Sequence, residues 1–148
     1  MRDQTGWSPS SSPTIIGCLS IAVFLTVSGC GYSGPKFSVQ ELKAAMDDPS
    51  RKVTVIDVRP AVLFRKGHVP GARNCSLEKL DEKAADIAAL DGEVALICTC
   101  GRNALNGVKR LNERGIETIL VVGGCKEWKK AGFPVEVGAG VQSKSAPR

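Results

Sequence analysis

The segment Val94–Glu113 constrains the fold more than any other stretch of this 148-residue chain. Its first four residues, Val94–Ile97, are all apolar, which is typical of a strand buried inside a parallel sheet. Cys98 follows directly, and then a polar loop, Thr99–Asn103, with a glycine in its middle. A helical pattern of apolar residues begins at Ala104. The segment therefore predicts a strand, a tight loop and a helix in quick succession.

A junction of this kind forms a pocket suited to a nucleophile at Cys98. The N–H groups of the loop are expected to point inward, and the helix N-terminus adds partial positive charge, so the thiolate is favoured. The same N–H groups can hold an oxyanion or a cysteine-bound persulfide. The alternative is that Cys98 only ends a buried strand, since free cysteine is often buried. This segment alone leaves both interpretations open.

The composition indicates one ordinary globular domain, with 43% hydrophobic and 24% charged residues. The net charge of +5 comes from scattered basic residues and aromatic residues make up only 5% of the chain, which argues against nucleic-acid binding. A modest positive field favours small anions such as thiosulfate and other sulfur oxyanions. Four of the six cysteines fall in the predicted folded part, each near the end of a predicted strand, which is not the pattern of a disulfide scaffold. They are Cys75, Cys98, Cys100 and Cys125.

Residues 1–29 are predicted to be a signal peptide. Ile15–Val27 is apolar throughout; it is too short to span a bilayer but has the length of a signal-peptide core. Small residues precede Cys30, and this arrangement resembles the lipobox of bacterial lipoproteins. The resemblance implies cleavage before Cys30, lipidation of that cysteine, and an extracytoplasmic protein anchored to the membrane of a bacterial envelope. An uncleaved hydrophobic anchor is the alternative.

The rest of the chain alternates predicted helices and strands, which favours an α/β fold with a largely parallel sheet. Residues 30–36 contain glycine and proline and are predicted to be a flexible tether. Residues 138–148 are predicted to be a loose tail. The predicted helices are 39–46 (with a capping box at Ser38), 60–66 (a short helix or turn), 77–90 (with Ser76 as its N-cap), the helix after the Cys98 loop, and a short one around Trp128. The predicted strands are 53–58, 72–75, 94–97 and 118–122.

Three stretches together resemble the rhodanese family of thiosulfate sulfurtransferase-like proteins. Ile56–Arg59 followed by Gly67–Ala72 resembles the first signature of that family. Val94–Gly101 resembles its strand leading into the active-site cysteine, and Gly123–Val135, with its double glycine, Trp and Gly-Phe-Pro-Val, resembles its C-terminal signature. The resemblance implies a single rhodanese domain over residues 37–137, with a mostly parallel central sheet and helices on both faces.

The resemblance also implies a function. Cys98 falls on the sulfur-carrying cysteine of the family, and the rest of a six-residue loop is filled by Thr99, Cys100, Gly101, Arg102 and Asn103. Dual-specificity phosphatases of related fold have a loop one residue longer, so the loop length here favours sulfur transfer. The expected reaction moves a sulfane sulfur from a donor such as thiosulfate to a thiol or to cyanide through a Cys98 persulfide. No metal and no organic cofactor is implied.

The sequence departs from the family pattern around this loop. Many single-domain members have Arg and then Ser where this chain has Asn103 and Ala104, and its own arginine comes one place earlier, at Arg102. Cys100 stands where a small polar or charged residue is expected, and Cys125 stands where a bulky apolar residue is usual. Two alternatives therefore stay open. One is a non-catalytic module that binds a partner or senses redox state, and the other is a thiol–disulfide or metal-handling protein built on Cys98 and Cys100, although two soft ligands make an incomplete metal site.

Four further side chains have a structural and a functional interpretation. Asp57 and Arg59 end a strand near the expected pocket and are expected to pair with each other or hold a loop, with Arg59 also a candidate for contact with an anion. His68 is the only histidine and lies in a glycine-proline turn, which favours a structural role over a Cys–His pair and excludes a histidine-based metal cluster. Cys75 is either a core residue or a resolving thiol.

The positions of the two loop thiols predict different roles for them. Cys98 leaves the buried strand and should lie at the floor of the loop, whereas Cys100 should face the rim and solvent. Cys100 is then either an auxiliary that attacks the Cys98 persulfide or a bystander.

Overall fold

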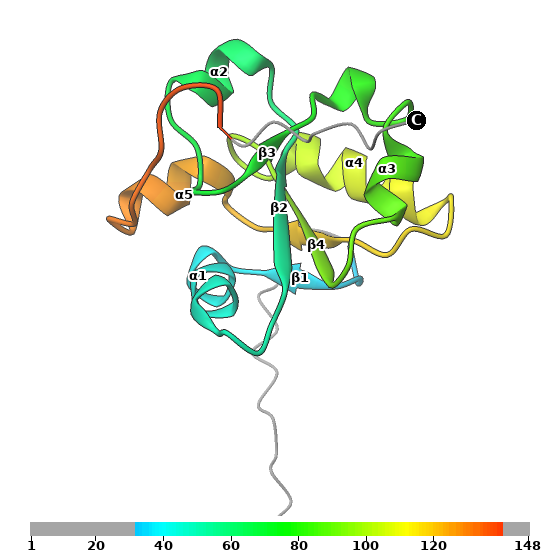
Figure 1. Ribbon diagram of the computed structural model, residues 1–148, viewed down its shortest axis with the longest axis horizontal. Coiled ribbons are helices and arrows are strands. Elements are labelled where there is room, and N and C mark those ends of the chain that lie inside the picture. Colours follow the sequence, from blue (N-terminus) through cyan, green and yellow to red (C-terminus); the bar gives the residue numbers. More distant parts are fainter. Residues whose placement is uncertain (1–31, 141–148) are drawn as a thin grey trace, which may run out of the picture. The chain divides into compact units, whose positions relative to one another are not determined.

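The computed structural model describes residues 32–140, so the predicted signal peptide, Cys30 and most of the predicted tail lie outside the described residues. Five strands form one sheet in the order β1-β5-β4-β2-β3 (Figure 1). The strands are β1 (Lys36–Phe37), β2 (Val53–Asp57), β3 (Arg73–Asn74), β4 (Glu93–Ile97) and β5 (Ile119–Val121). The helices are α1 (Val39–Asp47), α2 (Ala61–Arg65), α3 (Ala84–Ala88), α4 (Arg102–Asn112) and α5 (Gly124–Lys130), with a 3-10 turn η1 (Leu77–Lys79). No helix within residues 32–140 has the length and apolar character that crossing a membrane requires.

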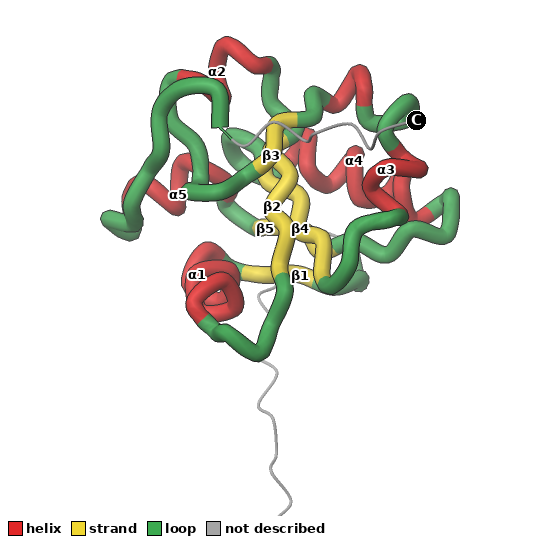
Figure 2. The backbone as a smooth tube through the Cα atoms, in the orientation of Figure 1, coloured by secondary structure: helices red, strands yellow, loops and turns green. Residues whose placement is uncertain are grey.

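The named strands are all paired in parallel, and the prediction that β2, β4 and β5 lie side by side is confirmed (Figure 2). β4 pairs with β2 along its full length, so that Asp57 and Ile97 are register partners. Parallel pairing brings the carboxyl ends of the strands to one edge of the sheet. The residues that follow β2 and β4, including Arg59 and Cys98, therefore leave the sheet at the same edge, where ligands bind in open parallel sheets.

Helices cover both faces of the sheet, as the resemblance implied (Figure 1). Along β4, Val94 and Leu96 point to one face, whereas Ala95 and Ile97 point to the other. The first face packs against α3 and α4, and the second packs against α1 and α5. The buried helical residues are Ala84, Ile87, Ala104, Val108 and Leu111 on the first face and Val39, Leu42, Phe64 of α2, Cys125 and Trp128 on the second. This double burial explains why β4 has no polar alternation.

Helix α1 begins where its sequence predicts. Ser38 Oγ accepts a hydrogen bond from the Glu41 N–H at 3.2 Å, and Glu41 Oε2 accepts one from the Ser38 N–H at 2.7 Å. This is the expected capping box, which satisfies two N–H groups at the helix start. The predicted strands 53–58, 72–75 and 118–122 extend one or two residues beyond the observed β2, β3 and β5, an error usual at element ends.

The single helix predicted over Leu77–Leu90 is wrong, because the segment forms only η1 and the short α3. The Leu77 carbonyl oxygen accepts a hydrogen bond from Arg110 Nη1 of α4 at 2.9 Å, and the Asp81 carboxylate pairs with the same guanidinium. These contacts with α4 override the helical spacing of the apolar residues. Ser76, the predicted N-cap, makes no capping hydrogen bond with its side chain.

The tether predicted over residues 30–36 is also wrong at its carboxyl end. Lys36 belongs to β1, where it is the register partner of Leu120, and the Pro35 carbonyl oxygen accepts a hydrogen bond from the Leu120 N–H at 3.0 Å. Tyr32 packs, partly buried, against the core on the α4 face. A strand of two residues is too short to show any alternation, so its sequence carries no signal for it.

Candidate active site

Cys98 lies directly after β4 and is buried, with 2% of its surface exposed. Its Sγ accepts a hydrogen bond from the Gly101 N–H at 3.1 Å. Gly101 is the N-cap of α4 and has a φ of 96°, a conformation that glycine adopts readily, so the loop can turn its N–H back toward the sulfur. Helix α4 begins at Arg102 rather than at the expected Ala104, because the turn at Gly101 already starts it. The positive end of the helix dipole is thereby brought next to the cysteine.

The two loop thiols differ in their exposure to solvent. Cys100 is exposed, whereas Cys98 is buried, as their positions in the loop predict. Thr99, Arg102 and Asn103 are also exposed, so this part of the loop is open to a donor or acceptor in solution. The chemical roles of these loop residues stay predictions.

Helix α5 holds the loop from the other side. The N–H groups of Cys125 and Lys126 donate to the carbonyl oxygens of Cys98 at 2.8 Å and Thr99 at 3.0 Å. A Cβ on Gly124, which has a φ of 59°, would lie 2.2 Å from the Cys98 carbonyl oxygen. The glycine therefore allows α5 to approach the Cys98 backbone, and the contact fixes where the cysteine leaves the strand.

Gly124→Ala should reduce stability more than Gly132→Ala does. Both glycines have a positive φ, of 59° and 75°, so each substitution loses about 1 to 2 kcal/mol from backbone strain. Gly132 has nothing within 4 Å of an added Cβ, which makes it the matched control, whereas Gly124 meets the backbone of the Cys98 loop. Urea denaturation of both variants measures the difference, and equal losses would contradict the proposed role of Gly124.

A buried ion pair lies at the end of β2, at the same edge of the sheet, as predicted. Asp57 is 0% exposed and Arg59 is 6% exposed, and Arg59 Nε lies 2.9 Å from both carboxylate oxygens. Arg59 Nη2 also donates to the Gly67 carbonyl oxygen at 3.0 Å, and the Asn74 side-chain amide donates to the Asp57 and Arg59 carbonyl oxygens. Burial lowers the pKa of Arg59, but the hydrogen bonds and charge of Asp57 outweigh it and raise the pKa above its ordinary value, with smaller contributions from Cys125 and Cys98. A direct contact of Arg59 with an anion stays a prediction.

Comparison with known proteins assigns the chain to a family. The family model of the rhodanese-like domain matches residues 38–131. The chain belongs to the rhodanese family. It is 32% identical over 92 residues to an HTH-type transcriptional regulator of Mycobacterium tuberculosis, covering 61% of this chain and 40% of the regulator. It is 28% identical over 83 residues to a thiosulfate sulfurtransferase of Shewanella oneidensis, covering 55% of this chain and 81% of that protein.

Solved structures show the same fold. A rhodanese-related protein of Thermoplasma volcanium superposes with a TM-score of 0.63 at 26% identity, covering 70% of this chain and 99% of the other. Several curated relatives are longer than the shared part, and this chain spans 29% to 50% of their length. The rhodanese domain is therefore shared by proteins of different overall organisation.

Cys125, which departs from the usual rhodanese residue, contacts the buried ion pair. Its Sγ lies 3.8 Å from Asp57 Oδ2. Burial, and then the charge of Asp57, raises the pKa of Cys125 to about 12. The thiol is therefore neutral near pH 7 and is not a nucleophile there. Burial likewise raises the pKa of the half-buried Cys75, which favours its interpretation as a core residue.

His68 has the contacts of a structural residue in this rhodanese domain. It is 1% exposed, its Nδ1 lies 2.9 Å from the Phe64 carbonyl oxygen, and its ring stacks on Phe64 with centroids 3.6 Å apart. Its backbone exchanges two hydrogen bonds of 2.9 Å with Glu136, which ties the segment after α5 to the glycine-proline turn.

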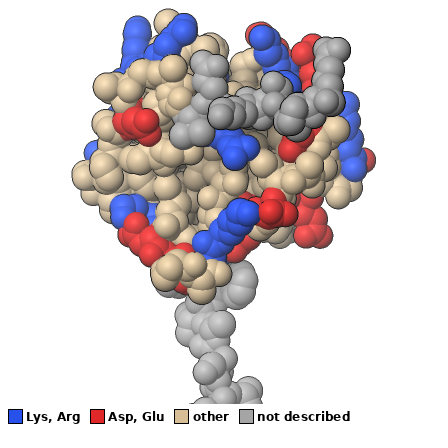
Figure 3. Space-filling model, viewed as in Figure 1, with Lys and Arg blue, Asp and Glu red and all other residues tan. Residues whose placement is uncertain are grey.

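Two features of the described part of the chain bear on metal and nucleic-acid binding. Residues 32–140 contain no group of three or more His, Cys, Asp or Glu side chains placed to hold a metal ion. Lys and Arg side chains are interspersed with Asp and Glu on the face seen in Figure 3, with no continuous basic stripe there.

Sequence reasoning missed the residues that hold the Cys98 loop and the Asp57–Arg59 pair in place from outside them. Lys126 and Cys125 act through their backbone N–H groups, and Gly67 acts through its carbonyl oxygen. Such contacts depend on the path of the chain and carry no side-chain signature. The side-chain amide of Asn74 donates to the carbonyl oxygens of Asp57 and Arg59. The position of Asn74 in the sequence does not indicate these partners.

Proposed function

We propose that this rhodanese domain is a sulfurtransferase that carries a sulfane sulfur on Cys98. The observation that supports the proposal best is the position of Cys98 Sγ at the carboxyl end of β4, 3.1 Å from the Gly101 N–H. A persulfide carries negative charge on its outer sulfur. N–H groups fixed in advance, together with the N-terminus of α4, stabilise such charge without reorganising during the reaction.

The proposed reaction has two displacement steps that balance without a cofactor. The Cys98 thiolate attacks the outer sulfur of a donor such as thiosulfate, so that a new S–S bond forms, the S–S bond of the donor breaks and sulfite leaves. Cyanide or a thiolate then attacks the outer sulfur of the persulfide. Thiocyanate, or the persulfide of the acceptor, leaves with that sulfur, and the Cys98 thiolate is restored. The net charge of +5 favours the approach of an anionic donor.

A turnover assay tests the proposal directly. The folded protein is incubated with thiosulfate and cyanide, and thiocyanate is followed with time. Thiocyanate formation above the uncatalysed rate is expected, and mass spectrometry of the donor-treated protein should show one added sulfur atom. If no donor among thiosulfate, thiosulfonates and persulfides yields product or adduct, the protein is not a sulfurtransferase.

The second candidate is a module without turnover that senses redox state or binds a partner. Burial of Cys98 and exposure of Cys100 favour it, because the exposed thiol is the one that an oxidant in solution meets first. The relative from Mycobacterium tuberculosis, named as a transcriptional regulator, contains the same domain in a longer chain. This candidate predicts oxidation at Cys100 and no thiocyanate in the turnover assay.

We also propose that the protein is a lipoprotein of the bacterial envelope, anchored through Cys30. The apolar segment Ile15–Val27 and the small residues before Cys30 support this proposal.

Cys30→Ser should release the protein from the membrane fraction or leave it unprocessed, since serine cannot carry the thioether-linked lipid. Membrane fractionation and the mass of the mature amino terminus measure the outcome. A Cys30→Ser protein that is still cut at the same bond and stays in the membrane fraction would contradict the anchor.

A further inference from the structure

Exposed apolar side chains gather on α2 and on the segment after α5. Val62 and Leu63 are on α2, which follows β2 at the carboxyl edge of the sheet, and Val62 is 54% exposed. Val135 and Val137 follow α5, and Val137 is 71% exposed. These are four of the five large hydrophobic side chains that are exposed within residues 32–140. Apolar side chains gathered in this way mark a candidate interaction surface.

The segment after α5 lies directly beside α2. Figure 1 shows it running from α5 to α2. The Gly138 N–H donates to the Arg65 carbonyl oxygen at 3.0 Å, which holds the segment against the end of α2. Glu136 is less exposed than its neighbours, and its backbone is bonded to the turn after α2. Because neighbouring side chains of an extended segment point to opposite sides, Val135 and Val137 both face solvent next to α2.

Basic side chains surround these apolar ones. Arg65 and Lys66 end α2, and Lys129 of α5 lies at the turn after α2, since its Nζ is 3.2 Å from a Cβ added to Gly67. All three cations are exposed, and the ion pairs within residues 32–140 include none of them. Figure 3 shows Lys and Arg side chains where α2 lies. We define the α2 patch as Val62, Leu63, Arg65, Lys66, Lys129, Val135 and Val137.

The α2 patch is next to the Cys98 loop. Helix α5 begins at that loop, where the Cys125 N–H donates to the Cys98 carbonyl oxygen at 2.8 Å, and Lys129 follows about 6 Å further along the helix axis. Val122, the fifth exposed hydrophobic side chain, comes directly after β5, and its Cα is 4.0 Å from a Cβ added to Gly101. A molecule bound to the patch is therefore within reach of the loop that holds the sulfur.

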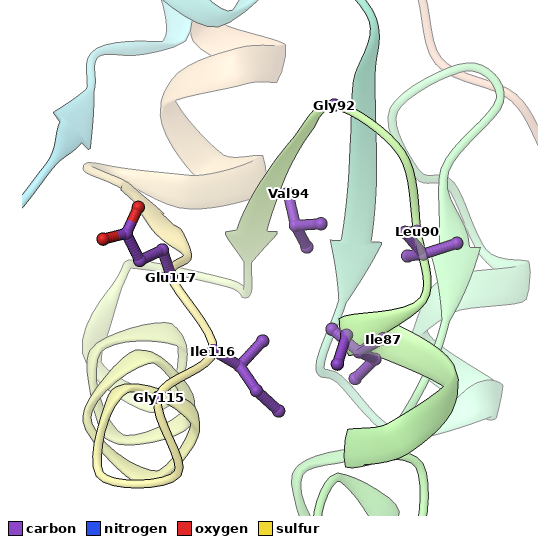
Figure 4. A pocket seen from close by; sticks show the side chains of 8 residues that line it. Ile87, Leu90, Gly92, Val94, Gly115, Ile116 and Glu117 are labelled. Atoms are coloured by element: carbon purple, nitrogen blue, oxygen red, sulfur yellow. The ribbon is translucent and has the colours of Figure 1, made fainter.

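The opposite edge of the sheet differs in both respects. The cleft of about 280 Å³ at that edge lies between α3 and the loop after α4 (Figure 4). None of the exposed large hydrophobic side chains of residues 32–140 lines it. Glu117 at this cleft and Glu113 just after α4 are exposed and belong to no ion pair within those residues. An acidic partner is therefore attracted to the α2 patch and repelled from the opposite edge.

We infer that the α2 patch docks an acidic, apolar segment of another protein whose cysteine accepts the sulfur from Cys98. The inference rests on the proposed sulfurtransferase function and names its acceptor class. Carboxylates pair with the free cations of the patch, and apolar side chains of the partner bury its valines and leucine. The acceptor thiolate attacks the outer sulfur of the persulfide, the S–S bond to Cys98 breaks, and the Cys98 thiolate leaves.

The charge of the patch disfavours two other occupants. Residues 141–148 of this chain contain Lys144 and Arg148 and no acidic residue, so they would bring further positive charge to the patch. A second copy that met this patch with its own would place the same cations opposite one another.

Sulfur transfer to matched peptides tests the inference. The full chain is loaded with sulfur from thiosulfate, free donor is removed, and loss of the added sulfur is followed by mass spectrometry. The acceptor is a short synthetic peptide with one cysteine among leucine and glutamate residues, and control peptides have lysine for glutamate or serine for leucine. At low ionic strength the leucine–glutamate peptide should react about tenfold faster per thiolate than either control, and salt should narrow its advantage over the lysine peptide.

These outcomes separate the docking surface from the proposed function. A loaded protein that reacts equally fast with all three peptides overturns the docking surface and leaves the sulfurtransferase standing. A chain that takes up sulfur from no donor overturns both. Faster transfer by a chain that ends at Gly140 would assign the patch to residues 141–148. A rate per molecule that falls as the protein concentration rises would assign it to a second copy, and either result overturns the inference.

Substitutions locate the effect on the patch. Val62→Ser with Val137→Ser, and separately Lys66→Glu, should each lower transfer to the leucine–glutamate peptide about fivefold relative to transfer to cyanide. Cyanide needs no docking, so this ratio corrects for any change at Cys98. Lys109→Glu is the matched control, because Lys109 is also exposed at the carboxyl end of a helix but belongs to α4, on the other face of the sheet. Equal ratios for Lys66→Glu and Lys109→Glu would contradict the docking surface.

Discussion

Cys98→Ser should abolish persulfide formation and reduce thiocyanate production to the uncatalysed rate. Serine has nearly the volume of cysteine and can still accept the hydrogen bond from the Gly101 N–H, so the fold should survive. The hydroxyl group is not ionised near pH 7 and cannot form a persulfide. The whole covalent route is therefore lost rather than weakened. The thiocyanate assay and the mass of the donor-treated protein measure the loss, and the circular dichroism spectrum checks the fold.

Cys100→Ser is the matched control for this result. Cys100 has the same side chain two residues away but is exposed, so its replacement should leave persulfide formation intact. If Cys100 is an auxiliary, its thiolate attacks Cys98 Sγ in the persulfide, hydrosulfide leaves, and a Cys98–Cys100 disulfide remains. The adduct on Cys98 should then last longer in the variant, whereas an unchanged lifetime identifies a bystander. Loss of the persulfide in Cys100→Ser but not in Cys98→Ser would overturn the assignment of the carrier.

The sequence predicts those parts of the molecule whose patterns are formed by residues close together along the chain. The apolar run Val94–Ile97 and the cysteine that ends it are contiguous, so the strand, the burial of Cys98 and the exposure of Cys100 follow from their order along the chain. The capping box at Ser38 is equally local, since its two hydrogen bonds join residues three positions apart. The parallel alignment of β2, β4 and β5 follows from the helices between them.

The parts that its sequence does not predict depend on contacts between distant residues. The segment Leu77–Leu90 has helical spacing, but Asp81 pairs with Arg110 of α4 and with Arg114 just after it, 29 and 33 positions further on, and the helix is interrupted. The contact of Cys125 with Asp57 joins residues 68 positions apart. Neither can be found from periodicity, because each depends on which surfaces the sheet brings together.

Asp57→Asn should produce the largest loss of stability among single substitutions at this edge of the sheet. Asparagine keeps the size of the side chain but removes the negative charge that Arg59 faces at 2.9 Å. Arg59 is 6% exposed and stays protonated, so its charge would remain buried without a partner. Breaking a buried pair in this way costs about 3 to 5 kcal/mol, a large part of the 5 to 15 kcal/mol by which a typical domain is stable. Urea denaturation at low temperature measures the change through the midpoint of unfolding.

Glu93→Gln provides the matched control, because it makes the same chemical change in an ion pair that water reaches. Glu93 pairs with Arg51 at the opposite edge of the sheet, where the arginine can be solvated once its partner is neutral, so the midpoint should move little. A double variant, Asp57→Asn with Arg59→Met, removes the stranded charge and should recover part of the stability lost in Asp57→Asn. Two results would contradict this prediction. One is an Asp57→Asn protein as stable as Glu93→Gln, and the other is a double variant less stable than Asp57→Asn. Either would show that the buried charge of Arg59 does not cause the loss of stability. Asp57→Asn and its control Glu93→Gln therefore separate the effect of burial from the effect of removing a carboxylate.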